Sequence, residues 1–414
     1  MKKVAFILFV VVALVSCDKA INKYNCYEPV YTDAETFRTP ASFESPRNIS
    51  GVGNIYFKDN HLFVVEPNEG IHLIDNSDPS NPQNVGFLNI MGASGLAIRG
   101  NYLYVTALVD LVVVDISSLY SPVEIAREED IFPTALPLME KNYPTKTIDK
   151  TKGIVTSWNV VKTEEEGNLY PQWTGCLNCE FITFSSADGS SGIANGVGTS
   201  GSFAQMAIID NYLYVMDNNI LKTYDITVPT NLITGEVEYL SWQAETIFPK
   251  EDYLYIGTTS GMMIYNTTNP LSPQHEGSIS HARACDPVVV QGNYAYVTIR
   301  SGGRCGGDIN QLDVIDISNR FNPTLVHTVD LKNPHGVGVD GNTLFVCDGD
   351  KGLKVFDVSD KNNVGDNLIK RFSNIKATDV IPYNGVAIVI GENGIFQYDY
   401  SDPENLELLS KITF

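Results

Sequence analysis

The chain has 414 residues, with 28 Lys and Arg against 49 Asp and Glu, and a formal net charge of −21. Nucleic-acid phosphates require a basic protein face, so this acidity argues against nucleic acid as a partner. It also disfavours docking on anionic lipids. The length allows two or three domains of ordinary size.

Residues 1–16 are expected to be a signal peptide. Lys2 and Lys3 form its charged start, and residues 4–15 are one apolar run that is too short to span a bilayer. The run ends in Leu-Val-Ser-Cys at residues 14–17, which resembles a bacterial lipobox. That resemblance implies cleavage before Cys17 and lipidation of its thiol and its new amino group. The alternative is an ordinary signal peptide followed by a chance cysteine.

Lipidation would anchor the mature chain stably in a membrane, because two or three acyl chains bind a bilayer stably whereas a single chain binds it only reversibly. We expect a lipid-anchored protein of the cell envelope, in the outer membrane, that faces either the periplasm or the outside. Residues 17–50 are polar, contain proline and show little periodicity, so we interpret them as the lipidated N-terminus and a tether. No other stretch is long and apolar enough for a transmembrane helix.

A unit of about 41 residues recurs from residue 51 to the end. An aromatic or aliphatic strand of the type Tyr-Leu-Tyr-Val is followed by a strand that ends in Asp-x-Ser or Asp-x-Thr. The first of these two strands starts at His61, Tyr102, Tyr212, Tyr253, Tyr294, Thr343 and Val386, and three of the steps are 41 residues. Such a period with about four short strands is typical of a propeller blade. We therefore predict an all-β, seven-bladed propeller with four-stranded antiparallel blades over residues 51–414.

Two kinds of turn punctuate each predicted blade. The pair Gly100-Asn101 recurs as Gly292-Asn293 and Gly341-Asn342, and both residue types tolerate the positive φ of a tight hairpin. The third strand closes with a repeated acid or amide at Asp75, Asp115, Asp225, Asn266, Asp316, Asp357 and Asp399. Such a side chain accepts backbone N–H groups of the following turn. The repeated residue is therefore predicted to be structural rather than catalytic.

One interval breaks the period. Tyr102 and Tyr212 are 110 residues apart, and the excess lies in residues 131–202, after blade two. Residues 153–163 have the pattern of strands, whereas residues 189–202 are rich in Gly and Ser. A degenerate eighth blade is the alternative. The absence of the Gly-Asn turn and of the Asp-x-Ser close favours an insertion in a seven-bladed ring.

The third strands carry a recognisable signature. They read LVVVD at residues 111–115, LDVID at 312–316 and LKVFD at 353–357. These segments resemble the LVIVD repeat, a propeller repeat of bacterial and archaeal surface proteins, over residues 51–414 apart from the insertion. With the lipobox, the chain is similar to LVIVD-repeat lipoproteins of the Bacteroidetes type. The resemblance implies a fold and export, and it implies no activity or catalytic residue.

Alignment of the repeats on the hairpin Asn places one residue of each blade at the mouth of the inner strand. These residues are Gly53, Ser94, Ala204, Glu245, Asp286, His335 and either Thr378 or Asp379. The loop after the second strand adds Arg300, Arg304 and Asp348. Blades four to seven thus offer titratable groups where blades one to three offer small residues. A convergent polar set in a concavity is the default site hypothesis, although a solvated channel mouth is polar in any case.

The sequence predicts no cofactor. Oxygens of Glu245, Asp286 and Asp379 would suit calcium, and His335 with these carboxylates would suit zinc or iron. There is no HExxH motif, EF-hand loop or cluster of histidines. There is also no GxSxG elbow and no Walker or Rossmann glycine pattern.

Two functions remain open. The first is a non-enzymatic binding or scaffold module for a protein or a glycan. The second is a propeller hydrolase or lyase, with or without a metal ion, whose site lies at the channel mouth of blades four to seven. Four aromatic residues of the insertion, Tyr143, Trp158, Tyr170 and Trp173, would stack on sugars or form a protein-binding hot spot. Their alternative role is a small satellite core under a long loop.

Six cysteines remain after Cys17, namely Cys26, Cys176, Cys179, Cys285, Cys305 and Cys347. Export permits disulfides, but fifteen full pairings are possible. The pair that is favoured is Cys285–Cys305, because both flank loops on one face of blade five and the second loop is rich in Gly. Cys347 is the rival partner, and Cys176 and Cys179 are expected to have a structural disulfide role.

Overall fold

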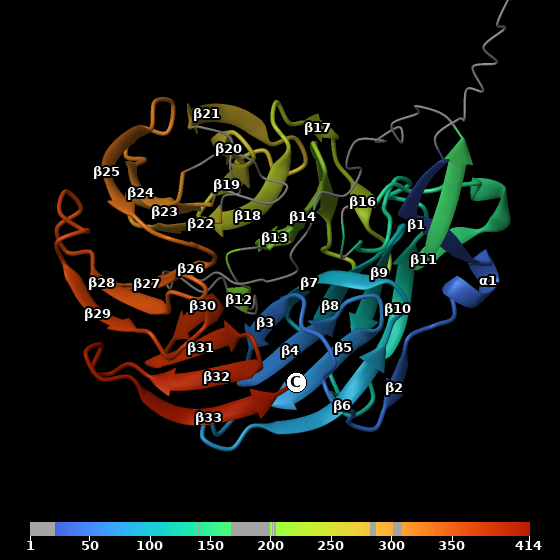
Figure 1. Ribbon diagram of the computed structural model, residues 1–414, viewed down its shortest axis with the longest axis horizontal. Helices are drawn as coiled ribbons and strands as arrows, with labels where there is room; N and C mark the ends of the chain where they lie inside the picture. Colours follow the sequence, from blue (N-terminus) through green and yellow to red (C-terminus); the bar gives the residue numbers. More distant parts are fainter. Residues whose placement is uncertain are drawn as a thin grey trace, which may run out of the picture.

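The computed structural model describes residues 21–139, 141, 143–166, 199–200, 202, 204–281, 287–300 and 309–414. Within these ranges, seven antiparallel sheets are arranged as blades around one axis (Figure 1). The predicted all-β, seven-bladed propeller with four-stranded blades is therefore confirmed. Along each blade the strands run from the hub to the rim in sequence order.

Blades one and two precede the insertion, and blade three follows it. Blade one contains β3 (Ile55–Lys58), β4 (His61–Glu66), β5 (Gly70–Asp75) and β6 (Gln83–Asn89). Blade two contains β7 (Ala93–Arg99), β8 (Tyr102–Ala107), β9 (Asp110–Asp115) and β10 (Val123–Glu128). Blade three contains β13 (Met206–Ile209), β14 (Tyr212–Asp217), β15 (Ile220–Asp225) and an outer strand split into β16 (Ile233–Thr234) and β17 (Glu238–Tyr239).

The last four blades follow one another without interruption. Blade four contains β18 (Ala244–Lys250), β19 (Tyr253–Thr258), β20 (Gly261–Asn266) and β21 (Gln274–Ser280). Blade five contains β22 (Val288–Gln291), β23 (Tyr294–Ile299), β24 (Gln311–Asp316) and β25 (Thr324–Asp330). Blade six contains β26 (Val337–Asp340), β27 (Thr343–Cys347), β28 (Leu353–Asp357) and β29 (Leu368–Phe372). Blade seven contains β30 (Ala377–Tyr383), β31 (Val386–Gly391), β32 (Gly394–Asp399) and β33 (Glu407–Thr413).

The repeated turns have the predicted geometry. Gly100, Gly292 and Gly341 have φ values of 57°, 58° and 57°, in the left-handed region that a tight hairpin requires. In every blade the acid or amide that closes the third strand accepts the N–H of the second residue after it, at 2.7–2.9 Å. The structural role predicted for these residues is therefore confirmed.

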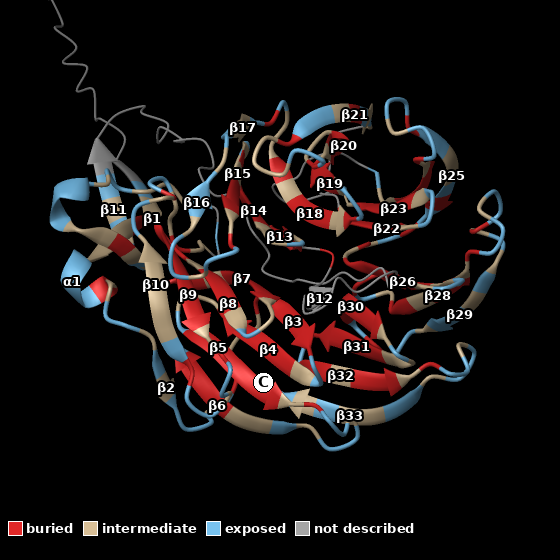
Figure 2. Cartoon of the chain, turned by 180° about the vertical axis from the view of Figure 1, so that it is seen from behind, coloured by how far each residue is buried: buried red, intermediate tan, exposed pale blue. Residues whose placement is uncertain are grey.

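The core lies between neighbouring blades and is densest toward the hub. Tyr104, Tyr214, Tyr255 and Tyr296, from equivalent positions of four second strands, are at most 1% exposed. Figure 2 shows the same gradient, with buried residues on the inner strands and exposed residues along the outer strands. This pattern follows from the sequence, because only strands covered on both faces can be continuously apolar.

The N-terminal segment is folded from Ile21 onward, within the residues that we interpreted as a tether. β1 (Ile21–Thr32) is followed by the one-turn helix α1 (Ala34–Phe37) and by β2 (Ser42–Glu44). β2 pairs with β6 on the outer edge of blade one. Among the described residues, no helix has the length and apolar character needed to cross a membrane.

The insertion contributes strands that belong to no eighth blade in the described part of the chain. After the 3-10 turn η1 (Lys150–Lys152), β11 (Ile154–Glu166) pairs with β1 to form a two-stranded ribbon beside the ring. β12 (Thr199–Ser200) pairs with β3, at the hub. The insertion therefore reaches both the outside of the ring and its centre.

Candidate functional site

The loops that follow the second strands, together with the loops that lead into the inner strands, form one face of the ring, here called the mouth face. Ser94, Glu245 and Thr378 each lie at a register shift between the first two strands of their blade. The hydroxyl groups of Ser94 and Thr378 also donate to equivalent carbonyls, at 3.3 and 3.1 Å. The mouth position of blade seven, which the sequence left open, is therefore Thr378.

Asp379 lies one position further along β30 and is fully buried. Its Oδ1 accepts hydrogen bonds from the Ser202 hydroxyl at 3.1 Å and from the Val380 N–H at 2.9 Å. A Cβ at Gly336 of blade six would collide with this carboxylate, so the absent side chain permits its close approach. Asp379 thus lies between blades six and seven, where it supports packing rather than the mouth.

A stretch that we call the hub segment, of which the structure describes residues 199–200, 202 and 204, leads from the insertion into blade three. Its strand β12 pairs with β3 of blade one, and Figure 1 shows β12 at the centre of the ring. The Ser202 hydroxyl, on a residue that is 2% exposed, accepts from the Val337 N–H at 3.2 Å and donates to Asp379. The carbonyl of Ala204 accepts from Ile247 N at 2.8 Å. The hub segment therefore contacts blades one, four, six and seven.

His335 and Arg300 lie together at the mouth of blades five and six. Arg300 Nη1 is 3.1 Å from His335 Nδ1, and because a guanidinium can only donate, Nδ1 must accept. Burial, assisted by the charge of Arg300, lowers the pKa of His335 to about 4. At neutral pH the imidazole is therefore neutral, with its proton on Nε2.

The backbone around His335 is held firmly. Its N–H donates to the Cys347 carbonyl at 2.7 Å, and its own carbonyl accepts from the Thr298 hydroxyl at 2.5 Å. Gly349 has a φ of 52°, and a Cβ there would be 3.0 Å from His335 Nε2. Because Gly349 has no side chain, the space beside His335 Nε2 stays open.

Asp348 is fully buried and holds the loop that leads to His335. Its Oδ1 accepts from the backbone N–H groups of Lys332 and Asn333 at 3.0 and 2.6 Å, and Lys354 Nζ is 2.9 Å from its Oδ2. The burial of Asp348 is compensated by these charged and polar partners. We conclude that Asp348, which we expected to line the mouth, is a positioning residue for it.

A cross-strand contact between an acid and a basic residue recurs in two other blades, as a hydrogen bond to histidine in blade one and as an ion pair in blade three. The sequence analysis missed both. Glu66 pairs with His72 at 2.8 Å in blade one, and Asp217 pairs with Lys222 at 3.3 Å in blade three. In each case the acid closes the second strand and the basic residue lies five or six positions later on the third strand. That spacing was the signal available in the sequence.

The sequence of the repeats matches the model of the LVIVD repeat in five segments, residues 51–89, 92–128, 191–235, 282–331 and 334–365. These segments fall on blades one, two, three, five and six. The protein is an LVIVD-repeat β-propeller. No curated protein matches the chain in sequence.

Solved structures share the fold of this LVIVD-repeat propeller at low sequence identity. A protein from Lactobacillus plantarum is 13% identical with a TM-score of 0.56, and the match covers 88% of this chain and 96% of that chain. The periplasmic gluconolactonase of Pseudomonas aeruginosa is 12% identical with a TM-score of 0.53, at 88% and 96% coverage. The computationally designed Ika8 protein is 12% identical with a TM-score of 0.51, at 89% and 88% coverage. These likenesses show the fold alone.

Other predicted site residues of the LVIVD-repeat propeller lie apart from His335 or outside the described residues. Glu245 is half-buried on β18 of blade four. The predicted residues outside the description are Cys17, Tyr170, Trp173, Cys176, Cys179, Cys285, Asp286, Arg304 and Cys305. In the described ranges, no three His, Cys, Asp or Glu side chains form a group suited to a metal ion.

The two described cysteines, Cys26 and Cys347, are free and buried. Burial, together with the nearby charges of Asp379 and Asp348, raises the pKa of the Cys347 thiol. The thiol therefore stays protonated and unreactive at neutral pH. Because Cys347 is free, it is not the disulfide partner of Cys285 or Cys305 in this structure. The Cys285–Cys305 pairing itself lies outside the described residues.

Of the four aromatic residues predicted as a patch in the insertion, the two that the structure describes, Tyr143 and Trp158, pack on the N-terminal segment. The ring centroids of Tyr143 and Trp158 are 5.6 and 5.9 Å from that of Tyr27, which is 4% exposed. Trp158 Nε1 donates to the Pro137 carbonyl at 2.9 Å. Tyr143 and Trp158 therefore form part of a small satellite core, which was the alternative to an exposed aromatic patch.

The N-terminal segment covers the mouth face of blades one and two. Phe37 of α1 is 1% exposed and packs on Leu108 and Val109, in the loop after the second strand of blade two. Arg47 contacts Glu66, which closes the second strand of blade one, at 2.9 Å. Figure 1 places α1, β1 and β11 on the side of the ring away from blades five and six, which carry Arg300 and His335.

Proposed function

We propose that this LVIVD-repeat propeller is a non-enzymatic binding module of the cell envelope, which takes a protein or a glycan at the mouth of blades five and six. The observation that carries the proposal is the 3.1 Å contact between Arg300 and His335. It fixes the imidazole as a neutral group whose Nε2–H donates. A rigid donor beside a guanidinium is suited to recognition of acceptor groups, and Arg is frequent at binding hot spots.

The chemistry of the described groups favours binding over catalysis. A general base works best when its pKa is near the operating pH, and the pKa of His335 lies at about 4. The carboxylates of Asp348 and Asp379 are both fully buried and bonded within the protein fold. The mouth therefore presents hydrogen-bond donors held in place, which is the equipment of a binding site.

The proposed location follows from the lipobox at residues 14–17. Lipidation of Cys17 would make the protein a lipoprotein of the Bacteroidetes type, anchored in the outer membrane through acyl chains such as palmitate. Only three residues, 18–20, separate Cys17 from the start of β1 at Ile21. The binding module would therefore operate close to the membrane.

The test compares binding and turnover in the same preparations. The mature protein in detergent is screened against a glycan array and a peptide panel, and against chromogenic glycosides, esters and lactones. His335→Ala and Arg300→Ala should each weaken binding by about tenfold or more. Ser94→Ala, at the equivalent mouth position of blade two, is the matched control and should leave binding unchanged.

Two results would contradict the proposal. Turnover of any chromogenic substrate that is lost in His335→Ala would establish the alternative, a propeller hydrolase or lyase with its site at this mouth. Binding that survives both substitutions at blades five and six would place the ligand elsewhere on the ring.

A further inference from the structure

The ribbon formed by β1 and β11 is long and regular. Twelve residue pairs run from Ile21↔Glu166 to Thr32↔Ile154, with one irregularity between Val30 and Tyr31. Twelve extended residues at about 3.3 Å each span roughly 40 Å. An isolated two-stranded ribbon is only marginally stable, so its supports decide whether it is stiff.

The first support is the satellite core around Tyr27. The Tyr27 N–H donates to the Pro144 carbonyl, and the Tyr27 carbonyl accepts from the Lys146 N–H, both at 2.8 Å. The phenol oxygen accepts from the Lys141 N–H at 2.9 Å. With the rings of Tyr143 and Trp158 against it, β1 is bonded on both edges at this point.

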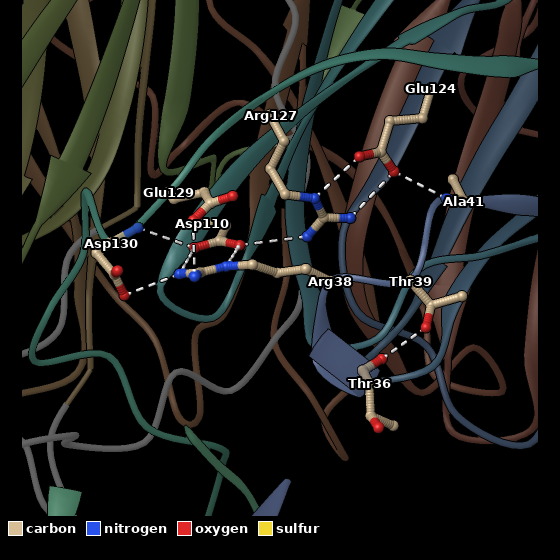
Figure 3. A network of polar contacts seen from close by, with 9 residues as sticks. All are labelled: Thr36, Arg38, Thr39, Ala41, Asp110, Glu124, Arg127, Glu129 and Asp130. Atoms are coloured by element: carbon tan, nitrogen blue, oxygen red, sulfur yellow. Dashed lines mark hydrogen bonds and ion pairs between the residues drawn. The ribbon is translucent and has the colours of Figure 1, made fainter. Parts of the chain in front are cut away.

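The second support is a clasp of charged residues that fixes the chain just after β1 to blade two (Figure 3). Arg38 Nε and Nη2 donate to the two oxygens of Asp110 at 2.9 and 3.1 Å. The same guanidinium reaches Glu129 at 2.7 Å and Asp130 at 2.9 Å. Bidentate Arg–carboxylate pairs are strong and directional, and Asp110 is fully buried.

The clasp continues into the outer strand of blade two. Arg127 Nη1 is 3.3 Å from Asp110 and Arg127 Nε is 2.9 Å from Glu124. Glu124 in turn accepts from the Ala41 N–H at 2.8 Å, on the stretch that leads to β2. The N-terminal segment is therefore held by blade two at two separate points, one on each side of Thr39.

The free end of the ribbon lies next to the proposed anchor. Cys17 precedes Ile21 by four positions, and an extended chain spans at most about 3.6 Å per residue, so the lipid attachment point at Cys17 would be at most about 14 Å from the ribbon end. We propose that the β1–β11 ribbon is a stiff stalk that sets the distance and orientation of the propeller relative to the bilayer. This inference rests on the proposed lipid anchor.

The stalk is tested by the distance between two spin labels, introduced as nitroxide amino acids so that native cysteines do not interfere. Val160 on β11 and Phe321 on blade five are suitable positions, because they are 54% and 74% exposed. The full-length lipoprotein in nanodiscs and the unlipidated Cys17→Ala protein should both give one narrow distribution. Arg38→Ala should broaden it at least about twofold.

The matched control is Lys23→Ala, which removes an exposed ion pair to Glu164 near the ribbon end and should leave the distribution unchanged. Trp158→Ala is a second variant, in case Arg38→Ala fails to fold, and it should broaden the distribution as well. A broad distribution in the unsubstituted protein, or one that neither substitution broadens, would overturn the stalk.

The bilayer part of the inference has its own readout. A fluorophore at position 321 is paired with labelled headgroups in vesicles of phosphatidylethanolamine and phosphatidylglycerol. Energy transfer between them should give a single distance from position 321 to the membrane surface. In Arg38→Ala the distribution of this distance should broaden. If Cys17 of the unsubstituted protein proves to carry no lipid while its spin-label distribution is narrow, the stand-off from the membrane is overturned together with the proposed anchor. A lipidated protein with a broad distribution would overturn the stalk and leave the proposed function intact.

Discussion

Asn76 of blade one and Gln397 of blade seven exchange two amide hydrogen bonds, 2.9 and 2.6 Å long, although 321 positions separate them. Both side chains are buried, with 4% and 0% exposure. They lie at the seam of the ring, where the first blade meets the last. Each of these two blades takes its four strands from one continuous stretch of chain, so no blade strand is exchanged across the seam. The seam is therefore held by side chains, including Ser410, whose hydroxyl donates to the Pro79 carbonyl at 2.6 Å.

The amide pair predicts strong coupling at the seam. Asn76→Ala or Gln397→Ala should each lower the free energy of unfolding by about 1–3 kcal/mol, because the remaining buried amide loses its partner. The double substitution should cost much less than the sum. Urea unfolding of the four proteins measures this coupling. Strictly additive costs would show that the two amides do not act as a pair.

The hub segment predicts a second lock on the same seam. Ser202→Ala removes the contacts to Asp379 and to the Val337 N–H, so it should cost about 1–3 kcal/mol and leave the carboxylate poorly compensated. Hydrogen exchange should rise in β3 and β30. Thr378→Ala, beside Asp379 but half-buried, is the control. Equal hydrogen exchange of β3 and β30 in the two variants would show that the hub segment does not stabilise the closure of the ring between blades one and seven.

His335 predicts a defined pH dependence. Its pKa is lowered from 6.5 to about 4 by burial and by the charge of Arg300. A lowered pKa contributes stability that is present above pH 6.5 and is lost as the pH falls toward 4. His335→Gln should flatten that loss, and Arg300→Gln should raise the pKa of His335. Histidine NMR titration measures both, and a midpoint near 6.5 in the unsubstituted protein would refute the assignment.

Cys17 predicts the mode of anchoring. Cys17→Ala should leave an unlipidated precursor and move the protein from the detergent phase to the aqueous phase, because the acyl chains are lost. Phase partition with metabolic palmitate labelling measures it. Retention in the membrane after this change would refute the lipoprotein.

The pair Cys285–Cys305 stays a prediction. A disulfide there would close a loop of about 20 residues and stabilise the protein by roughly 3 kcal/mol in the loop-entropy model. Peptide mapping without reductant should recover the two cysteines linked. Two free thiols after export, or a link from either one to Cys347, would overturn it.

The repeating part of the fold could be predicted because each blade is encoded locally. The hairpin at Gly100 and the closing turn at Asp115 depend on neighbours within a few residues, so their patterns recur visibly. The same alignment placed Ser94 and His335 at equivalent mouth positions. The alignment could not decide between Thr378 and Asp379 at the mouth of blade seven. The bulge in β30 that places Thr378 there is a feature of strand pairing, which the sequence pattern does not show.

The rest could not be predicted because it depends on contacts between unlike segments. Tyr27 meets Trp158 across more than 130 residues that share no period, so nothing in the sequence linked the N-terminal segment to the insertion. Asp348 was correctly placed after its strand, but its bonds to the Lys332 and Asn333 N–H groups depend on the path of the preceding loop. Burial and partners, rather than position, separate a positioning carboxylate from a ligand-binding one.

The most direct test of the account is the affinity of the mature protein for its tightest glycan or peptide from the array, measured by isothermal titration beside His335→Gln and Arg300→Gln. The proposed site predicts a Kd weakened by about tenfold or more in each variant, with a Tm close to that of the unsubstituted protein. An unchanged Kd in both variants would contradict binding at the mouth of blades five and six.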